Sequence, residues 1–189
     1  MEITQRLKRK KYYKEEELIS ILKQLSNALF FLQTKSIAHR DIKPENILLF
    51  RQNNNNNDIV YKICDFGEAK DFAFIRSKKQ KTLRGTELYM SPLLYDGLMK
   101  DDSYVEHNAY KSDVFSLGCC MIIAMNLNFE IINDIRKIKE QDRIKEFLKN
   151  KLNGKYSDKL LDIIMKMINF NEKERIDFVQ LENLIEKNF

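Results

Sequence analysis

The hydrophobic positions of the chain repeat mainly with the period of a helix. Between residues 15 and 34, leucines recur at steps of three and four, at positions 18, 22, 25, 29 and 32. This spacing predicts an amphipathic helix with one buried stripe. Residues 113–125 are apolar on nearly all sides, which predicts a central buried helix. Further helical patterns cover residues 134–152, 158–169 and 177–187.

The sheet signal is confined to two short segments rich in Ile, Leu and Val, residues 46–50 and 59–64. They flank an asparagine-rich stretch, residues 52–58, whose composition favours turns and predicts a loop. Residues 65–92 have few apolar positions and several basic ones, and a long stretch of this kind is usually either functional or disordered. The pattern therefore predicts a mainly α fold with one small β-hairpin.

Length and composition limit the class of protein. A chain of 189 residues with 43% hydrophobic and 32% charged residues is typical of one soluble globular domain. No apolar run is long enough to span a membrane, and the N-terminal segment lacks the apolar core of a secretory signal. The three cysteines follow neither a disulfide framework nor a metal-binding spacing, which favours a reducing, intracellular compartment. We expect a cytoplasmic protein, with a nuclear location as the alternative.

The charge of the chain is mildly basic. The formal net charge of +5 is compatible with anionic substrates but does not require nucleic acid, so no nucleic-acid partner is expected. A basic cluster near the N-terminus has two interpretations, a nuclear or nucleic-acid signal and the solvated face of a helix. The second is the more common.

Two short motifs supply groups suited to phosphate chemistry. The segment AHRDIKPENILLF, residues 38–50, contains Asp41, Lys43 and Asn46, and Asp65 follows at the end of the next expected strand. Phosphoryl transfer needs a carboxylate to orient the attacking hydroxyl, oxygen ligands for Mg²⁺ and cations for the phosphate charge. All three kinds of group are present within these two motifs.

The order HRDIKPEN and then DFG resembles the eukaryotic protein kinase family, serine/threonine type. The resemblance continues over nearly the whole chain, through GTELYMSP at 85–92, SDVFSLG at 112–118 and NEKERI at 171–176. It implies that residues 1–189 form a single domain similar to the large C-terminal lobe of a kinase. It also implies that the hairpin carries the catalytic and metal-binding loops and that residues 65–93 are the activation segment.

The resemblance also implies roles for individual residues. Asp41 would orient the substrate hydroxyl, and Lys43 would stabilise the transferring phosphoryl group. Asn46 and Asp65 would bind Mg²⁺, and Leu48 would form part of the apolar floor under adenine. The implied cofactors are ATP and Mg²⁺, and the implied partner is a protein substrate.

Other positions of the motifs imply support and regulation. His39 and Phe66 would stack, and Asp113 would anchor the catalytic loop from below. Arg40 would pair with a phosphate on the activation segment, with Thr82 the first choice for that phosphate and Ser77 the second. Lys43 and Thr86 both resemble the serine/threonine branch of the family rather than the tyrosine branch.

Two departures from the family pattern qualify these expectations. Neither a glycine-rich GxGxxG loop nor a VAIK-like strand precedes Asp41, so we expect the N-terminal β lobe to be absent from the chain. Isolated residues 1–189 should then bind ATP weakly or not at all and turn over negligibly, because positioning supplies much of the catalysis. The apolar surface around Leu48 would be exposed and open to a partner that covers it. The alternative to a kinase is a non-catalytic lobe that acts as a binding or regulatory module.

The second departure lies at Leu93, where the family has a glutamate that pairs with a late arginine, here Arg175. A buried arginine without a partner is strongly destabilising. We therefore expect either that a nearby acid such as Asp96 replaces the glutamate or that Arg175 is more exposed than in relatives.

Overall fold

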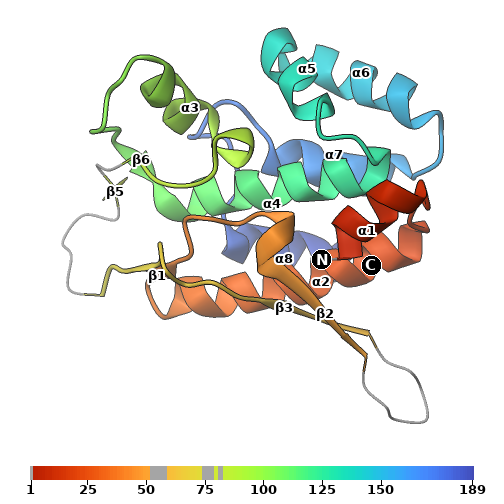
Figure 1. Cartoon of the computed structure of the whole chain (residues 1–189), viewed down its shortest axis with the longest axis horizontal. Coiled ribbons are helices and arrows are strands. Elements are labelled where there is room, and N and C mark those ends of the chain that lie inside the picture. Colours follow the sequence, from red (N-terminus) through yellow and green to blue (C-terminus); the bar gives the residue numbers. More distant parts are fainter. Residues whose placement is uncertain (1, 52–58, 74–78, 81–82) are drawn as a thin grey trace.

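The computed structural model describes residues 2–51, 59–73, 79–80 and 83–189, and these are mostly helical (Figure 1). The α-helices are α1 (Glu2–Arg9), α2 (Glu15–Thr34), α3 (Pro92–Met99), α4 (Ala109–Asn126), α5 (Ile131–Ile138), α6 (Gln141–Leu152), α7 (Asp158–Met167) and α8 (Phe178–Asn188). Two short 3₁₀ helices, η1 (Pro44–Asn46) and η2 (Glu87–Tyr89), lie in the connecting segments. None of the helices in these ranges is long and apolar enough to cross a membrane.

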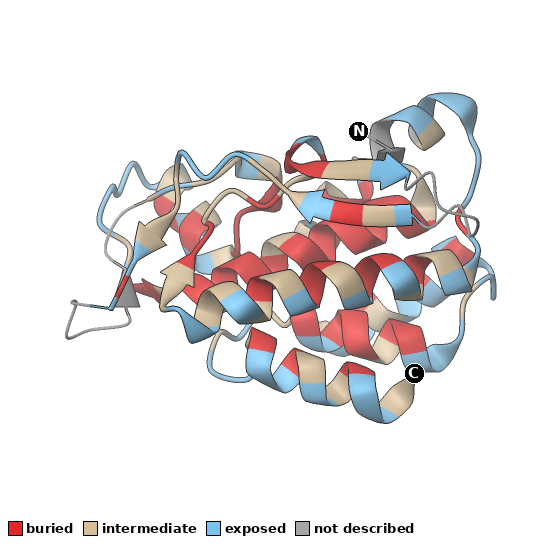
Figure 2. Cartoon of the chain, turned by 90° about the horizontal axis from the view of Figure 1, so that it is seen from below, coloured by how far each residue is buried: buried red, intermediate tan, exposed pale blue. Residues whose placement is uncertain are grey.

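The core is built around α4, the helix predicted from the apolar stretch at 113–125. Almost all of its residues are buried, and it packs against α2, α5 and α7. The Asn108 side chain accepts hydrogen bonds from the amides of Tyr110 and Lys111, which caps the first turn. Gly118 brings α4 close to α7, because a Cβ at this position would lie 2.6 Å from the Ile168 side chain. Buried residues, red in Figure 2, lie where the helices face one another.

The helical predictions are confirmed with two differences. The helix predicted at 15–34 is α2, and the patterns at 158–169 and 177–187 correspond to α7 and α8. The pattern at 134–152 is wrong as one helix, because the chain turns at Lys139, where φ is 62°, and forms α5 and α6. The short helices α1 and α3 were not predicted.

The predicted hairpin is confirmed as the antiparallel pair of β2 (Ile47–Arg51) and β3 (Ile59–Ile63). Its register runs from Ile47 opposite Ile63 to Arg51 opposite Ile59, and residues 52–58 between the strands lie outside the described residues. Two further antiparallel pairs have only two residues a strand. They are β1 (Ile37–Ala38) with β4 (Lys70–Asp71), and β5 (Lys79–Gln80) with β6 (His107–Asn108).

Arg175 is held in a way that contradicts both expectations for it. Its side chain is fully buried, and in the described part of the chain it forms no ion pair with Asp96 or any other carboxylate. Instead its guanidinium donates to three carbonyl oxygens, those of Asn169 at 2.7 Å, Lys111 at 3.2 Å and Phe170 at 3.5 Å. The guanidinium also lies 4.9 Å from the centre of the Phe115 ring.

The partners of Arg175 are therefore backbone carbonyls and an aromatic face, and not the carboxylate that the resemblance implies. Their compensation for burial is incomplete, because burial still lowers the pKa of Arg175, to about 10. Leu93, where the resemblance implies a glutamate, is 39% exposed.

The substitution Arg175→Met should lower the free energy of unfolding by about 3 kcal/mol, because it leaves three carbonyl oxygens without their donor inside the protein. Urea denaturation followed by circular dichroism measures this change. The matched control is Arg143→Met on α6, where the side chain is 70% exposed and a change within about 0.5 kcal/mol is expected. Equal stabilities of the two variants would contradict this account of the core.

Candidate active site

The site is built on the segment that joins β1 to β2 and on the residues that follow β3. η1 lies within the first segment, and Asn46 ends it directly before β2. The amide of Cys64 donates to the carbonyl oxygen of Asn46 at 2.9 Å, which continues the hairpin ladder by one step. The two strands therefore place Asp65, the residue after Cys64, beside Asn46.

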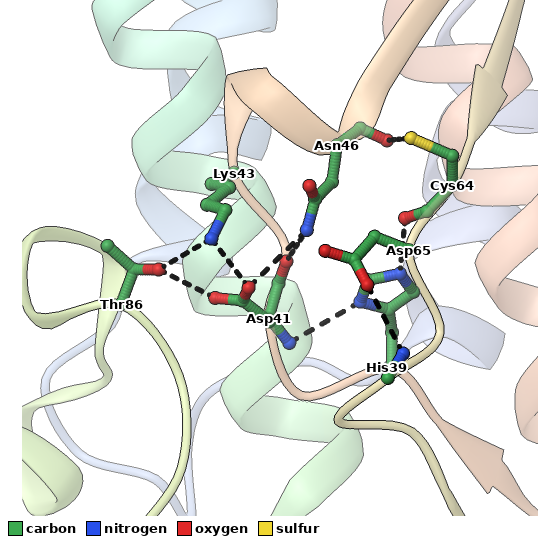
Figure 3. A network of polar contacts seen from close by, with 8 residues as sticks. His39, Asp41, Lys43, Asn46, Cys64, Asp65 and Thr86 are labelled. Carbon is green, nitrogen blue, oxygen red and sulfur yellow. Dashed lines mark hydrogen bonds and ion pairs between the residues drawn. The ribbon is translucent and has the colours of Figure 1, made fainter.

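Asp41, Lys43 and Thr86 form the centre of the polar network in Figure 3. Lys43 Nζ donates to Asp41 Oδ2 at 2.7 Å and to Thr86 Oγ1 at 3.1 Å. Thr86 Oγ1 in turn donates to Asp41 Oδ1 at 2.7 Å. Both oxygens of the Asp41 carboxylate are thereby oriented, one by a cation and one by a hydroxyl from a segment 45 residues away.

Asn46 and Asp65 place two further side chains with oxygen atoms beside Asp41 (Figure 3). Asn46 Nδ2 donates to the Asp41 carbonyl oxygen at 2.9 Å, which leaves its Oδ1 for another partner. Figure 3 shows Asp65 beside Asp41 and Asn46, which both come from the segment between β1 and β2. Asp65 is exposed, and its Oδ1 accepts from the amide of Gly67 at 3.3 Å.

The segment that carries Asp41 is anchored by Asp113, which lies in the first half of α4. The fully buried carboxylate accepts from the amide of His39 at 2.7 Å and from the amide of Arg40 at 2.8 Å. Arg40 has a φ of 67°, in the left-handed region that side chains rarely adopt, so these two bonds hold a strained turn. Burial raises the pKa of Asp113 to about 7, although both amides favour the charged form.

His39 and Phe66 contact each other, with ring centres 5.0 Å apart in an edge-to-face arrangement. His39 Nε2 donates to the Cys64 carbonyl oxygen at 3.1 Å, and its Nδ1 accepts weakly from the Asp41 amide at 3.4 Å. Burial lowers the pKa of His39, consistent with a neutral ring in this tautomer. His39 thus links the segment of Asp41 to the segment of Asp65.

The predicted regulatory and adenine-floor residues lie in different surroundings. Arg40 Nε donates to the Glu68 carbonyl oxygen at 2.5 Å, and the nearby Arg84 forms an exposed ion pair with Glu68 at 3.4 Å. Thr82 and Ser77 lie outside the described residues. Leu48 is half-buried on β2, opposite Lys62.

Three exposed apolar side chains lie on this hairpin and on the loop after it. Phe50 is 45% exposed, Ile59 is 38% exposed and Phe66 is 49% exposed.

Three contacts around the site were missed by the sequence reasoning. Ser116 Oγ donates to the Tyr89 carbonyl oxygen at 2.8 Å, and Arg136 binds three carbonyl oxygens of the same segment. Cys64 Sγ donates weakly to the Asn46 carbonyl oxygen at 3.4 Å. Ser116 lies within the SDVFSLG motif, but the resemblance implied no role for it, and Arg136 belongs to none of the motifs. Nothing in the local pattern distinguishes either residue from ordinary helix residues.

Asp41 and Lys43 each stabilise the charged form of the other. Burial alone would raise the pKa of Asp41, but the hydrogen bonds from Lys43 and Thr86 outweigh it and hold the pKa below its ordinary value. The hydrogen bond to Asp41 raises the pKa of Lys43. The site therefore holds an ionised carboxylate bound to an ammonium at neutral pH.

The described chain is mainly helical and holds this network at the segments around Asp41 and Asp65. The protein kinase domain model matches residues 1–187, and the chain belongs to this family.

Similar curated proteins include calcium-dependent protein kinase 4 of Plasmodium berghei, 32% identical over 178 residues, which are 90% of this chain and 30% of that protein. A probable serine/threonine-protein kinase of Dictyostelium discoideum is 32% identical over 90% of this chain and 9% of its own length. The serine/threonine-protein kinase ATG1 of Pichia angusta is 29% identical over 88% of this chain and 21% of its own length. The chain therefore spans less than a third of the length of these relatives.

The substitution Lys43→Met should raise the pKa of Asp41, because burial remains while the largest opposing interaction is removed. In the unaltered chain the pKa of Asp41 is lower in the folded state than its ordinary value of 3.8. The ionised carboxylate therefore stabilises the fold at pH values above 3.8, and this contribution is lost as the pH falls through the folded-state pKa. A carboxyl ¹³C NMR titration measures the change, with Asp41→Asn identifying the signal. Lys187→Met on α8 is the control, and an Asp41 pKa that stays the same or falls in Lys43→Met would contradict the assignment.

Proposed function

We propose that the chain carries the catalytic and metal-binding residues of a serine/threonine protein kinase, which transfers the γ-phosphoryl group of ATP to protein hydroxyls. The observation that carries the proposal is the Asp41 carboxylate, fixed between the Lys43 ammonium and the Thr86 hydroxyl at 2.7 Å from each. A carboxylate oriented in this way can accept a hydrogen bond from a substrate hydroxyl and align it for attack. The membership of the chain in the protein kinase family supports the same reaction.

Asp41 and Lys43 have complementary roles in this proposal. Asp41, with a lowered pKa, is ionised at neutral pH and would position and deprotonate the hydroxyl of a substrate serine or threonine. Lys43 is a cation two residues away whose ammonium bridges Asp41 and Thr86, and it would stabilise charge on the phosphoryl group. Thr86 would hold the side chains of Asp41 and Lys43 in position through its hydroxyl, and it would favour serine or threonine as the phosphoryl acceptor.

Asn46 and Asp65 fit a magnesium ion by the chemistry of their donors. Mg²⁺ prefers oxygen ligands and is usually held by one or two carboxylates together with substrate phosphates. Asp65 supplies an exposed carboxylate, and Asn46 supplies an amide oxygen because its nitrogen is engaged with Asp41. When bound, the ion would neutralise charge on the phosphates of ATP. Leu48, at the start of β2, would contact the adenine.

The isolated 189-residue polypeptide should be inactive or very weakly active, because its sequence contains no glycine-rich loop to hold the phosphates. A partner that covers the exposed side chains of Phe50 and Phe66 would complete the nucleotide cleft. The competing proposal, a non-catalytic module, rests on the same exposed side chains, and an activity measurement separates the two.

Fusion of residues 1–189 behind a glycine-rich small lobe of the kinase family should give transfer of ³²P from Mg²⁺-ATP to a serine- or threonine-containing peptide. The matched control is Asp41→Asn in the same fusion, which should lose about 10²–10⁴-fold in rate because the base is removed while the size of the side chain is kept. A fusion that binds Mg²⁺-ATP but does not phosphorylate the peptide would favour the non-catalytic module.

Regulation through Thr82 is a second part of the proposal. A phosphate on Thr82 would pair with Arg40, whose backbone is held by Asp113, and would order residues 68–84 of the activation segment. In the active fusion, Thr82→Ala should therefore lower the phosphorylation rate, and Ser77→Ala should have a smaller effect. Equal rates for the unaltered fusion and Thr82→Ala would contradict this mode of regulation.

A further inference from the structure

We propose that Arg136, on α5, is a positioning residue that fixes the backbone after Thr86 and so holds the Thr86 hydroxyl on Asp41. The significance of this contact for catalysis rests on the function proposed above. The positioning itself is a structural property that can be measured without activity.

Arg136 donates hydrogen bonds to three carbonyl oxygens of the segment that follows Thr86. Its Nη2 lies 2.9 Å from the carbonyl oxygen of Glu87 and 3.0 Å from those of Leu88 and Met90. The guanidinium carbon lies 4.2 Å from the centre of the Tyr95 ring, on α3. The ring face and the three oxygens fix the arginine from two sides.

The remaining carbonyl of the segment is bound from α4. Ser116 Oγ donates to the Tyr89 carbonyl oxygen at 2.8 Å. Four consecutive carbonyl oxygens, at residues 87 to 90, are therefore bound by side chains from α4 and α5. The next residue, the buried Ser91, is joined to Ser112 of α4 by a hydrogen bond between their hydroxyls at 3.1 Å.

The segment has little local structure to hold it without these contacts. η2 is a single 3₁₀ turn, with the Tyr89 amide bound to the Thr86 carbonyl at 2.9 Å and the Met90 amide bound to the Glu87 carbonyl at 3.2 Å. A turn of this length is not stable alone. Its position therefore depends on the side chains that bind its carbonyl groups.

Thr86 transmits the position of this turn to the site. Its backbone opens η2, and its Oγ1 bonds to both Asp41 and Lys43. A hydrogen bond of 2.7 Å is lost when the donor moves by about 1 Å. Release of the turn would consequently detach Thr86 from Asp41 even though Arg136 contacts neither of them.

Arg175 does not hold the same segment. Its hydrogen bonds go to carbonyl groups of Asn169, Phe170 and Lys111, and Leu93, which follows the segment, is 39% exposed. The contacts that hold residues 87–90 come instead from α5 and α4. Leu93 cannot form an ion pair with Arg175, and Arg136 holds residues 87–90 in place by binding their carbonyl oxygens.

Threonine methyl NMR tests the proposal on the 189-residue chain. The sequence has four threonines, at 4, 34, 82 and 86, so the ¹³C-methyl spectrum is simple, and Thr86→Ser identifies the relevant signal. In Arg136→Met, which keeps an apolar side chain against Tyr95 but removes the donors, the Thr86 methyl signal should shift while that of Thr34 stays in place. The amides of Tyr89 and Met90 should exchange with solvent about tenfold faster or more.

The matched control is Arg143→Met, which removes an exposed arginine and should change none of these signals. Arg136→Lys keeps a charged donor but loses the planar group over Tyr95, so it should give a smaller shift and a smaller rise in exchange than Arg136→Met. An unchanged Thr86 methyl signal and unchanged exchange in a folded Arg136→Met chain would overturn the proposal. If Arg136→Met does not fold, the same absence of change in Arg136→Lys would overturn it.

Measurements on the small-lobe fusion separate this proposal from the proposed function. If both hold, Arg136→Lys lowers kcat and leaves the KM for ATP unchanged, because the nucleotide does not touch Thr86 in the proposed arrangement. An inactive unaltered fusion combined with a shifted Thr86 signal in Arg136→Met would refute the function and support the positioning. An active fusion combined with an unchanged Thr86 signal would refute the positioning and support the function.

Discussion

The candidate active site depends on one buried carboxylate. Asp113 is carried by α4, in which almost all residues are buried, and accepts hydrogen bonds from the two successive amides of His39 and Arg40. Burial raises its pKa to about 7, so the solvation that the carboxylate loses is only partly offset by these bonds. Since Asp41 follows directly, its place relative to the helical core is set by this anchor. The helical core thus fixes the position of the solvent-accessible Asp41 side chain through Asp113.

A second constraint comes from the segment that carries Thr86. The Asp41 carboxylate needs partners from outside its own loop, and Thr86 reaches it only because the four carbonyls that follow are bound by Arg136 and Ser116. The chain also solves a related problem at Arg175, where backbone carbonyls and the Phe115 ring replace a carboxylate. In both places a buried or half-buried arginine side chain binds several main-chain carbonyl oxygens and so holds their segment against the helices.

The sequence predicted the features that are either periodic or local. α2 was predicted correctly because its leucines repeat every three or four residues, and the β2–β3 hairpin because its strands flank a stretch of turn formers. The contact of His39 with Phe66 and the anchoring by Asp113 agree with the implication of the family resemblance. The roles of Asp41, Lys43, Asn46 and Asp65 in catalysis and metal binding remain predictions, although their side chains lie together.

The remaining features depend on distant contacts that no local pattern contains. The break between α5 and α6 lies at a lysine with positive φ, and lysine is not a residue that marks turns. The burial of Arg175 was not foreseen, because carbonyl groups from three separate residues meet only in the folded chain. Arg136 lies 46 to 49 residues from the carbonyls that it binds, in a helix whose isoleucines have ordinary helical spacing and give no sign of this contact.

The most direct measurement of the central claim is the amide hydrogen exchange of His39 and Arg40 in the unaltered chain and in Asp113→Asn. Asparagine has nearly the same shape but only one accepting oxygen, so at least one of the two amides should lose its partner and exchange on the order of a hundredfold faster. The account predicts strong protection of both amides in the unaltered chain and this loss in a folded variant. Weak protection in the unaltered chain, or equal protection in the two proteins, would contradict it.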